Sequence, residues 1–372
     1  MDFTKTEIHA SVDALADQIF RGQVNDDYHK ARRDQSEGFD RDLWRVLADA
    51  GLLAGTLSEA SGGSDMNLLE VSGLLEAQGA VLAKLPLWQS IVASQLIDRF
   101  GSQDQKTALL PSFARGDSHL SLAFAEAARA DFDDLLKIKN HSVNGLVNDV
   151  AFAQQASAII LPLQTDEGTI LYLLDPSQDG VTLLLQMASN DEPHYQLQLN
   201  NLSIDPVNII ASSNGSVDLV EWVLQRSYTA LAAVQLGVVQ EAIKRTANYV
   251  NERHQFNKPL SSFQAVSHRA ANGYIDYSSL RACVYLAAWR LSEDKDASAE
   301  ARTAKWWACE AGHRIAHTAQ HLHGGLGADV DYPIHRYFLW AKQLEYALGG
   351  AQQQLASLGR QLANNDSLGF VI

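Results

Sequence analysis

Basic residues are scarce in this chain of 372 residues. Lys and Arg together number 29 against 44 Asp and Glu, which gives a formal net charge of -15 at pH 7. Proteins that bind nucleic acid or an anionic lipid surface usually carry clustered positive charge. The composition therefore argues against a nucleic-acid partner.

Long apolar runs and cysteines are also few. No stretch reaches the roughly 18 uninterrupted apolar residues that a membrane-spanning helix needs, so no membrane span is expected. The first residues, MDFTKTE, lack the basic start and apolar run of a secretory signal, which predicts a cytoplasmic location. The two cysteines, Cys283 and Cys309, cannot form a CxxC metal knuckle. They lie among helix-forming residues, where buried free thiols are expected.

What is present is typical of a globular protein, with 46% hydrophobic and 20% charged residues. At about 150 residues per domain, the length predicts two to three structural units. Apolar residues recur at helical spacing from about residue 12 to residue 115, as at Leu43, Val46 and Leu47. A Gly-Gly-Ser turn at 62–64 and a later proline, Pro86, divide this region into several helices. We therefore predict an N-terminal helical domain over residues 1–117.

The next hundred residues have the pattern of strands and turns. Short apolar runs at 119–124, 157–163 and 169–174 are separated by clusters of Asp, Gly, Asn and Pro. Asn144-Gly145 is a strong signal for a hairpin turn. These features predict an antiparallel β-sandwich or barrel over residues 118–217.

Helical periodicity returns near residue 221 and continues to the end of the chain. Four long helices are expected, at 221–253, 263–294, 298–323 and 333–364. Amphipathic helices of this length pack best as an antiparallel bundle, so a C-terminal four-helix bundle is predicted over residues 218–372. Three tryptophans, Trp289, Trp306 and Trp307, are expected to fill its core. The predicted fold is mainly α with a central β domain.

Few motifs carry an obvious chemistry. The spacing of His313, His317 and His321 could bring imidazoles together, but the segment lacks the glutamate of a zinc-protease helix, so no metal site is predicted. A glycine-rich segment at 324–327 follows a helix instead of a strand, which argues against a dinucleotide fold of the Rossmann type. The loop at 253–264 offers Arg, Phe and Gln, which could contact a diphosphate and a nucleotide. On its residues alone, this segment is predicted to be an ordinary loop between two helices.

The residues of this loop nevertheless carry a resemblance. RHQFNKPL, beginning at Arg253 and followed by FQAV, resembles the flavin-binding signature of the acyl-CoA dehydrogenase family. The segments at 43–53, 61–63, 125–126, 322–327 and 332–337 are similar to other motifs of that family, so the likeness covers nearly the whole chain. It implies the family's fold and an α,β-dehydrogenation of an acyl-CoA thioester with FAD as cofactor. It also implies an electron-transfer acceptor as a further partner.

The same resemblance implies roles for particular residues. Arg253 would contact the flavin diphosphate, Phe256 would pack near the dinucleotide, and Gln264 would hydrogen-bond to it. In place of the glutamine expected before the Gly-Gly turn stands His321, which can still make one hydrogen bond. The pair Gly324 and Gly325 would let the backbone approach the cofactor across a subunit interface.

The departures from the family concern the reacting half of the site. Leu348 stands where the usual glutamate base is expected, and Ser227 stands at the alternative base position. Asp149-Val150-Ala151 replaces the Trp-Ile-Thr segment that packs against the flavin ring. No catalytic residue is therefore assigned. The chain resembles the silent partner in the heterotetrameric branch that acts on steroid side-chain CoA thioesters.

Two other interpretations stay open at this point. The chain could be a self-sufficient, homo-oligomeric flavoenzyme whose base has moved to Asp149 or Glu345. It could also be a flavin-free interaction protein on the same scaffold, since a fold does not determine function.

Overall fold

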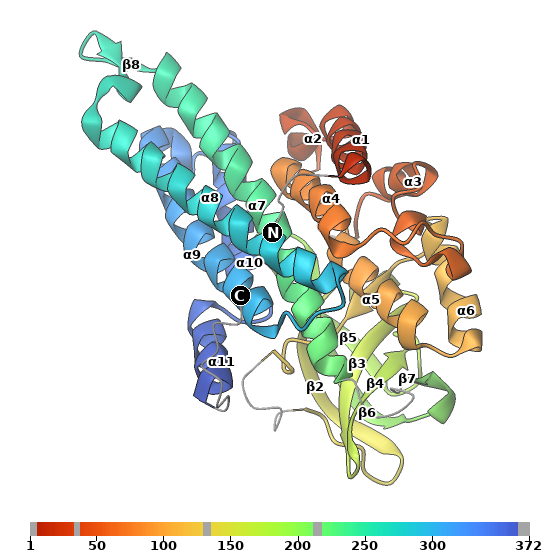
Figure 1. Cartoon of the computed structure of the whole chain (residues 1–372). Helices are drawn as coiled ribbons and strands as arrows, with labels where there is room; N and C mark the ends of the chain where they lie inside the picture. The colour runs from red at the N-terminus through yellow and green to blue at the C-terminus, as the bar shows by residue number, and fades with distance from the viewer. Residues whose placement is uncertain (1–5, 33–37, 129–134, 211–217, 364–372) are drawn as a thin grey trace.

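The computed structural model describes residues 6–32, 38–128, 135–210 and 218–363. In the sequence, a helical region at the start of the chain and another at its end flank a middle region of strands. In space the strands lie together at one side of the molecule, next to α5 (Leu87–Phe100) and the start of α7 (Leu219–Glu252) (Figure 1). The predicted fold class, mainly α with a central β region, is confirmed.

Six α-helices form the first region. They are α1 (Glu7–Gln23), α2 (Asp26–Ala31), α3 (Arg41–Asp49), α4 (Leu68–Val81), α5 (Leu87–Phe100) and α6 (Gln103–Ala114). Capping boxes begin two of them: Asn67 with Glu70 at α4, and Ser102 with Gln105 at α6. These side chains satisfy backbone N–H groups that lack a partner within the helix.

The fourth helix packs directly against the first long helix of the C-terminal region, α7 (Leu219–Glu252). Two glycines allow the contact. A Cβ atom on Gly79 would lie 2.0 Å from the carbonyl oxygen of Val234, and one on Gly237 would lie 1.9 Å from that of Glu76. Because any side chain at either position would clash with backbone, these glycines join the two helical regions closely.

The middle region consists of two small sheets with a shared apolar core between them. The strands are β1 (Leu120–Leu122), β2 (Ser142–Ala151), β3 (Ala158–Thr165), β4 (Gly168–Leu174), β5 (Val181–Met187), β6 (Pro193–Ser203) and β7 (Ile209–Ile210). One sheet has the order β1-β3-β4-β7 and the other has the order β2-β6-β5. Most pairs are antiparallel, but β1 pairs with β3 in parallel, which the sequence did not reveal.

The hairpin turn predicted at Asn144-Gly145 is wrong. Both residues lie inside β2, where the register against β6 shifts between Val143 and Gly145. The Asn144 side-chain oxygen accepts a hydrogen bond from the backbone N–H of Asn201 on β6, at 2.8 Å. The pair therefore forms an irregularity within a strand, a place where Asn and Gly are also favoured.

Five α-helices form the C-terminal region. After α7 come α8 (Gln264–Ser292), α9 (Ser298–His323), α10 (Ile334–Tyr346) and α11 (Ala351–Ala363). The single helix predicted at 333–364 is thus two helices. The chain turns between them, where Leu348 and Gly349 both have positive φ, at 51° and 92°. Fully buried Lys305 donates from Nζ to the carbonyls of Leu344 (2.7 Å) and Glu345 (3.2 Å), which satisfies the end of α10.

The expected tryptophan core of the bundle is only partly found, because all three tryptophans are half-buried and, of the three, Trp307 packs against the core cluster. Small residues on one face of α9 fill the interior instead, among them Ala304 and Ala308. Both cysteines are free, with Cys309 buried and Cys283 half-buried. Among the helices in the described part of the chain, none is long and apolar enough to cross a membrane.

Candidate functional site

The residues expected to hold a dinucleotide gather at one end of the helical bundle. That end carries the small hairpin labelled β8 in Figure 1, where α7 ends and α8 begins. Arg269 on α8 and His321 near the end of α9 are joined there, with 3.1 Å between NH1 and Nδ1. Tyr249 on α7 stacks on His323, with ring centroids 4.3 Å apart. The structure therefore brings together two segments about 60 residues apart. They contain the six residues predicted from the sequence: Arg253, Phe256, Gln264, His321, Gly324 and Gly325.

The hairpin itself presents an aromatic ring to its surroundings. Strands β8 (His254–Gln255) and β9 (Lys258–Pro259) pair antiparallel through a two-residue turn. Both turn residues, Phe256 and Asn257, have positive φ, at 53° and 63°, as a type I′ turn requires. Asn tolerates this backbone conformation well, whereas a bulky aromatic residue does not. Phe256 is nevertheless held there with 84% of its surface exposed, which suits a role in contacting another molecule.

The other groups at this end are equally accessible. Arg253 is exposed, and its guanidinium makes no hydrogen bond or ion pair with the described residues. Gln264 is exposed at the first position of α8. A Cβ atom added to Gly324 or Gly325 would meet nothing within 4 Å. The chain's own packing leaves this surface open, and its donor set fits the phosphates and a flat ring of a dinucleotide.

The two residues that the resemblance places at the base positions, Leu348 and Ser227, carry no carboxylate. Leu348 is apolar and 8% exposed, in the turn between α10 and α11. Ser227, in the middle of α7, is fully buried, and its hydroxyl has no hydrogen-bond partner among the described residues. The structure therefore places no carboxylate at either position.

The two carboxylates considered as relocated bases are both held by cations. The Oδ1 atom of Asp149, on β2, lies 2.5 Å from Nδ1 of His194, on β6. Glu345 accepts a hydrogen bond from Nζ of Lys342 at 2.7 Å, and Nδ1 of His313 lies 3.4 Å away. Both carboxylates are therefore already engaged by groups of this chain.

The pair of Asp149 and His194 makes a testable contribution to stability. Burial alone would lower the pKa of His194, but the hydrogen bonds and charges of Asp149 and Glu192 raise this pKa to about 9. The protonated imidazole of His194 therefore stabilises the fold fully below its ordinary pKa of about 6.5, and this stabilisation is lost as the pH rises through 9. We expect the free energy of unfolding to fall by roughly 3 kcal/mol over this interval. Urea denaturation at several pH values measures this decrease in the free energy of unfolding.

The matched variant for this prediction is Asp149→Asn. It should lower the stability near pH 6 and flatten the decrease toward pH 9, because Glu192 alone then faces the imidazole. An unchanged decrease in the variant would show that the pair does not contribute.

The histidines near the end of the bundle are engaged locally. The rings of His313 and His317 lie 4.5 Å apart, and Lys342 Nζ lies 2.6 Å from Nδ1 of His313. His321 faces Arg269. Within the described residues, no group of three or more His, Cys, Asp or Glu side chains is placed to hold a metal ion.

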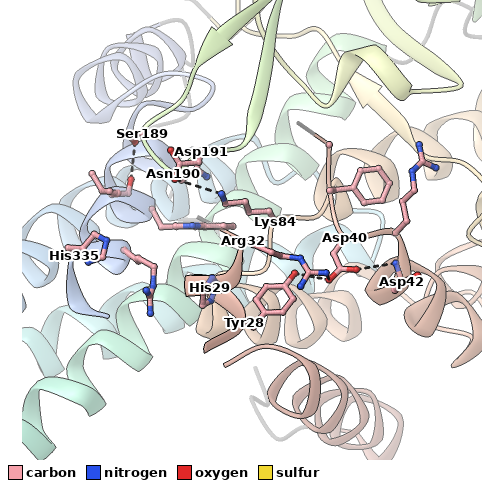
Figure 2. A pocket seen from close by; sticks show the side chains of 16 residues that line it. Tyr28, His29, Arg32, Asp40, Asp42, Lys84, Ser189, Asn190, Asp191 and His335 are labelled. Atoms are coloured by element: carbon pink, nitrogen blue, oxygen red, sulfur yellow. Dashed lines mark hydrogen bonds and ion pairs between the residues drawn. The ribbon is translucent and has the colours of Figure 1, made fainter. Parts of the chain in front are cut away.

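A cavity of about 300 Å³ was not predicted from the sequence. Figure 2 shows its lining, which comes from α2, the start of α3, the connection before α5, the β5–β6 turn and α10. Its cations are largely paired: Arg32 lies 3.0 Å from Asp40, Lys84 lies 3.7 Å from Asp191, and Arg336 lies 2.8 Å from Asp26. Residues so far apart in the chain give no local sequence signal, which is why the cavity was missed.

Comparison with known proteins matches both helical regions to one family. Residues 6–117 match the model "Acyl-CoA dehydrogenase, N-terminal domain", and residues 217–363 match "Acyl-CoA dehydrogenase, C-terminal domain". The chain is 37% identical to the acyl-CoA dehydrogenase FadE27 of Mycobacterium tuberculosis, over 98% of this chain and 99% of that protein. It is 29% identical to FadE28 of the same organism, over 86% of this chain and 92% of that protein.

The fold of the chain is also similar to that of solved structures. A chain of the ChsE4-ChsE5 complex from Mycobacterium tuberculosis superimposes with a TM-score of 0.91 at 36% identity, covering 99% of this chain and 100% of that one. A chain of the Tcur3481-Tcur3483 steroid ACAD, in its G363A variant, superimposes with a TM-score of 0.84 at 34% identity. In that case 95% of this chain and 97% of the other are covered.

Proposed function

Because this chain belongs to the acyl-CoA dehydrogenase family, we propose that it is the base-free subunit of a heteromeric acyl-CoA dehydrogenase. It would share FAD with a homologous partner that provides the proton-abstracting carboxylate. The observation that carries the proposal is the pair Leu348 and Ser227, which leaves both base positions without a carboxylate. Abstraction of a proton beside a thioester carbonyl requires a positioned base, so this base must come from another chain.

The cofactor fits the open end of the bundle. When bound, FAD supplies an acceptor for the hydride that leaves the β carbon of the thioester. Arg253 would hold its diphosphate, because a guanidinium presents several donors to phosphate oxygens. Gln264 and His321 would add hydrogen bonds, and Phe256 would cover an apolar face. Gly324 and Gly325 would admit close approach of the backbone.

Cofactor sharing is supported by how this surface is placed. The six cofactor residues are all exposed on the outside of the bundle, whereas Asp149, which replaces the first residue of the ring-packing segment, is tied to His194. A chain with this arrangement can complete a site on a neighbouring subunit without holding a whole site of its own.

The nature of the substrate and partner rests on similarity. The two superimposed structures are complexes named for two proteins each, and the Tcur3481-Tcur3483 complex is a steroid ACAD. We therefore propose a steroid side-chain CoA thioester as substrate and a homologous acyl-CoA dehydrogenase subunit as partner. The self-sufficient alternative is disfavoured because Lys342 and His194 neutralise the two carboxylates that it would require.

Expression of the chain alone and together with a homologous subunit tests the proposal. Flavin absorbance and turnover of a steroid acyl-CoA thioester are measured for both preparations. We expect turnover in the complex and at least about a hundredfold less in the lone chain, since a general base contributes 10²–10⁴-fold. In the complex, Asp149→Asn and Glu345→Gln should each leave turnover within about twofold. Comparable turnover by the lone chain would refute the proposal, and so would a loss of turnover in either variant while the variant complex stays folded and assembled.

A further inference from the structure

A second cavity, of about 520 Å³, lies between the two helical regions and away from the cofactor surface. Its walls come from the loop before α4, the end of α5, the first turns of α7 and the end of α8. The lining combines hydrogen-bonding groups with a few apolar side chains. Its hydrogen-bonding residues include Thr56, Ser58, Asn67, Gln95 and Ser292.

One buried cation faces this cavity without a carboxylate partner. Arg226, on the first turns of α7, is only 9% exposed. Its guanidinium carbon lies 3.7 Å above the ring of Trp222. Among the described residues, its guanidinium makes one hydrogen bond, a long one of 3.4 Å to the carbonyl of Trp222, and no carboxylate lies within 4.0 Å. Most of its five N–H donors are therefore unused.

The neighbouring charges do not neutralise this arginine. The charged groups that act on it are Arg99 and Asp294, and these two are paired with each other at 2.7 Å. Burial and the charge of Arg99 lower the pKa of Arg226 to about 9, and Asp294 opposes the decrease. Even so, the guanidinium is charged at neutral pH. A buried charge without a counter-ion is costly, and an anion that enters the cavity could meet the unused donors of Arg226 and lower this cost.

The contrast with a second buried arginine supports this interpretation. Arg302 on α9 is 7% exposed, and both of its terminal nitrogens bond to Glu221, at 2.6 and 2.7 Å. The chain thus supplies an internal counter-ion where a buried arginine has a structural role. It supplies none for Arg226.

We infer that this cavity is a binding site for a small organic monocarboxylate, held through Arg226. A carboxylate matches the planar fork of a guanidinium with two parallel hydrogen bonds. The side chains of Asp65, Asp98 and Asp294 also line the cavity, so a phosphate dianion would be repelled more strongly than a single carboxylate. The site is independent of the shared FAD and of the missing base, and the failure of either proposal leaves the other standing.

Two variants of opposite expected effect test the site in the full-length chain. Arg226→Gln removes the cation, and we expect it to weaken carboxylate binding at least tenfold, as charge-assisted hydrogen bonds contribute about 1.5–3 kcal/mol. Asp294→Asn removes a nearby negative charge and should tighten binding about threefold. It is a conservative change because Asn tolerates the positive φ of 50° at this position.

Calorimetric titration supplies the measurement. The probes are benzoate, hexanoate and gluconate, which are monocarboxylates with aromatic, aliphatic and hydroxylated bodies, each tested beside its uncharged amide and beside inorganic phosphate. We expect saturable binding of at least one carboxylate and at least tenfold weaker binding of its amide. The absence of binding by all three, tighter binding of phosphate, or equal binding by Arg226→Gln would overturn the assignment. If Arg226→Gln does not fold, the test rests on Asp294→Asn. Unchanged or weaker carboxylate binding by that variant would overturn the assignment.

Discussion

Replacement of Arg253 by alanine is expected to lower the FAD content of the assembled complex to below about a tenth of the wild-type value after desalting. The guanidinium is exposed at the base of the β8–β9 hairpin and has no ion pair with the described residues. Its donors are free for phosphate oxygens, and a charge-assisted hydrogen bond contributes about 1.5–3 kcal/mol. Flavin absorbance relative to protein concentration measures the loss.

Lys244→Ala is the matched control for this prediction. It removes one positive charge from the same helix, two to three turns before Arg253, and its ammonium lies 3.8 Å from Glu241. Flavin content should stay near the wild-type value in this variant, because a partly screened surface charge contributes little. If both variants lose flavin equally, the contact at Arg253 is not specific. If neither loses it, the role of Arg253 is refuted.

The second large effect is expected for Gly325→Leu. In the isolated chain, a Cβ atom at this position meets nothing within 4 Å. The midpoint of thermal unfolding of the isolated variant should therefore differ from that of the wild type by less than about 2 °C. In the complex, the bulky side chain would occupy the space that FAD or the partner backbone enters. We therefore expect flavin content and assembly to fall at least about tenfold.

Size-exclusion chromatography with absorbance detection separates the two parts of this prediction. Gly62→Ala is a useful comparison, because this glycine also has open space around it but lies in the N-terminal region and has a φ of 83°. That variant should lose some stability through backbone strain without losing flavin. Normal assembly and flavin content in Gly325→Leu would show that Gly325 lies outside the interface.

Particular elements show how far sequence reasoning reached. The helix at 298–323 was predicted with the bounds that the structure has, because its pattern is periodic and Gly324 ends it. Its neighbour at 333–364 was predicted as one helix and is two. The sequence does mark the break, with Gly349-Gly350 after Leu348, but the helical periodicity on both sides outweighed this signal in the prediction. Asn144-Gly145 was interpreted as a turn because a hairpin turn and an irregular strand favour the same residues.

Some features of the candidate site could also be predicted from the sequence, and others could not. Arg253, Phe256 and Gln264 lie within one short loop, so their motif was visible in the chain. An antiparallel bundle already places the start of α8 and the end of α9 at the same end. The direct contact between Arg269 and His321 depends on how the two helices pack against each other, which their spacing does not determine. The leucine at position 348 is visible in the sequence, and the proposed loss of the base rests on it. The pairing of Asp149 with His194 depends on the register of β2 against β6 and could not be seen in the sequence.

By itself, the sequence determined the order of helices, strands and helices, the family, and that residues 348 and 227 are Leu and Ser and not carboxylates. These properties depend on residue type and on local periodicity, which are present in the unfolded chain. Only the tertiary structure decided which charges are compensated, as Arg302 is by Glu221 and Arg226 is not. An ion pair requires two side chains within about 4 Å, and packing alone brings distant segments that close.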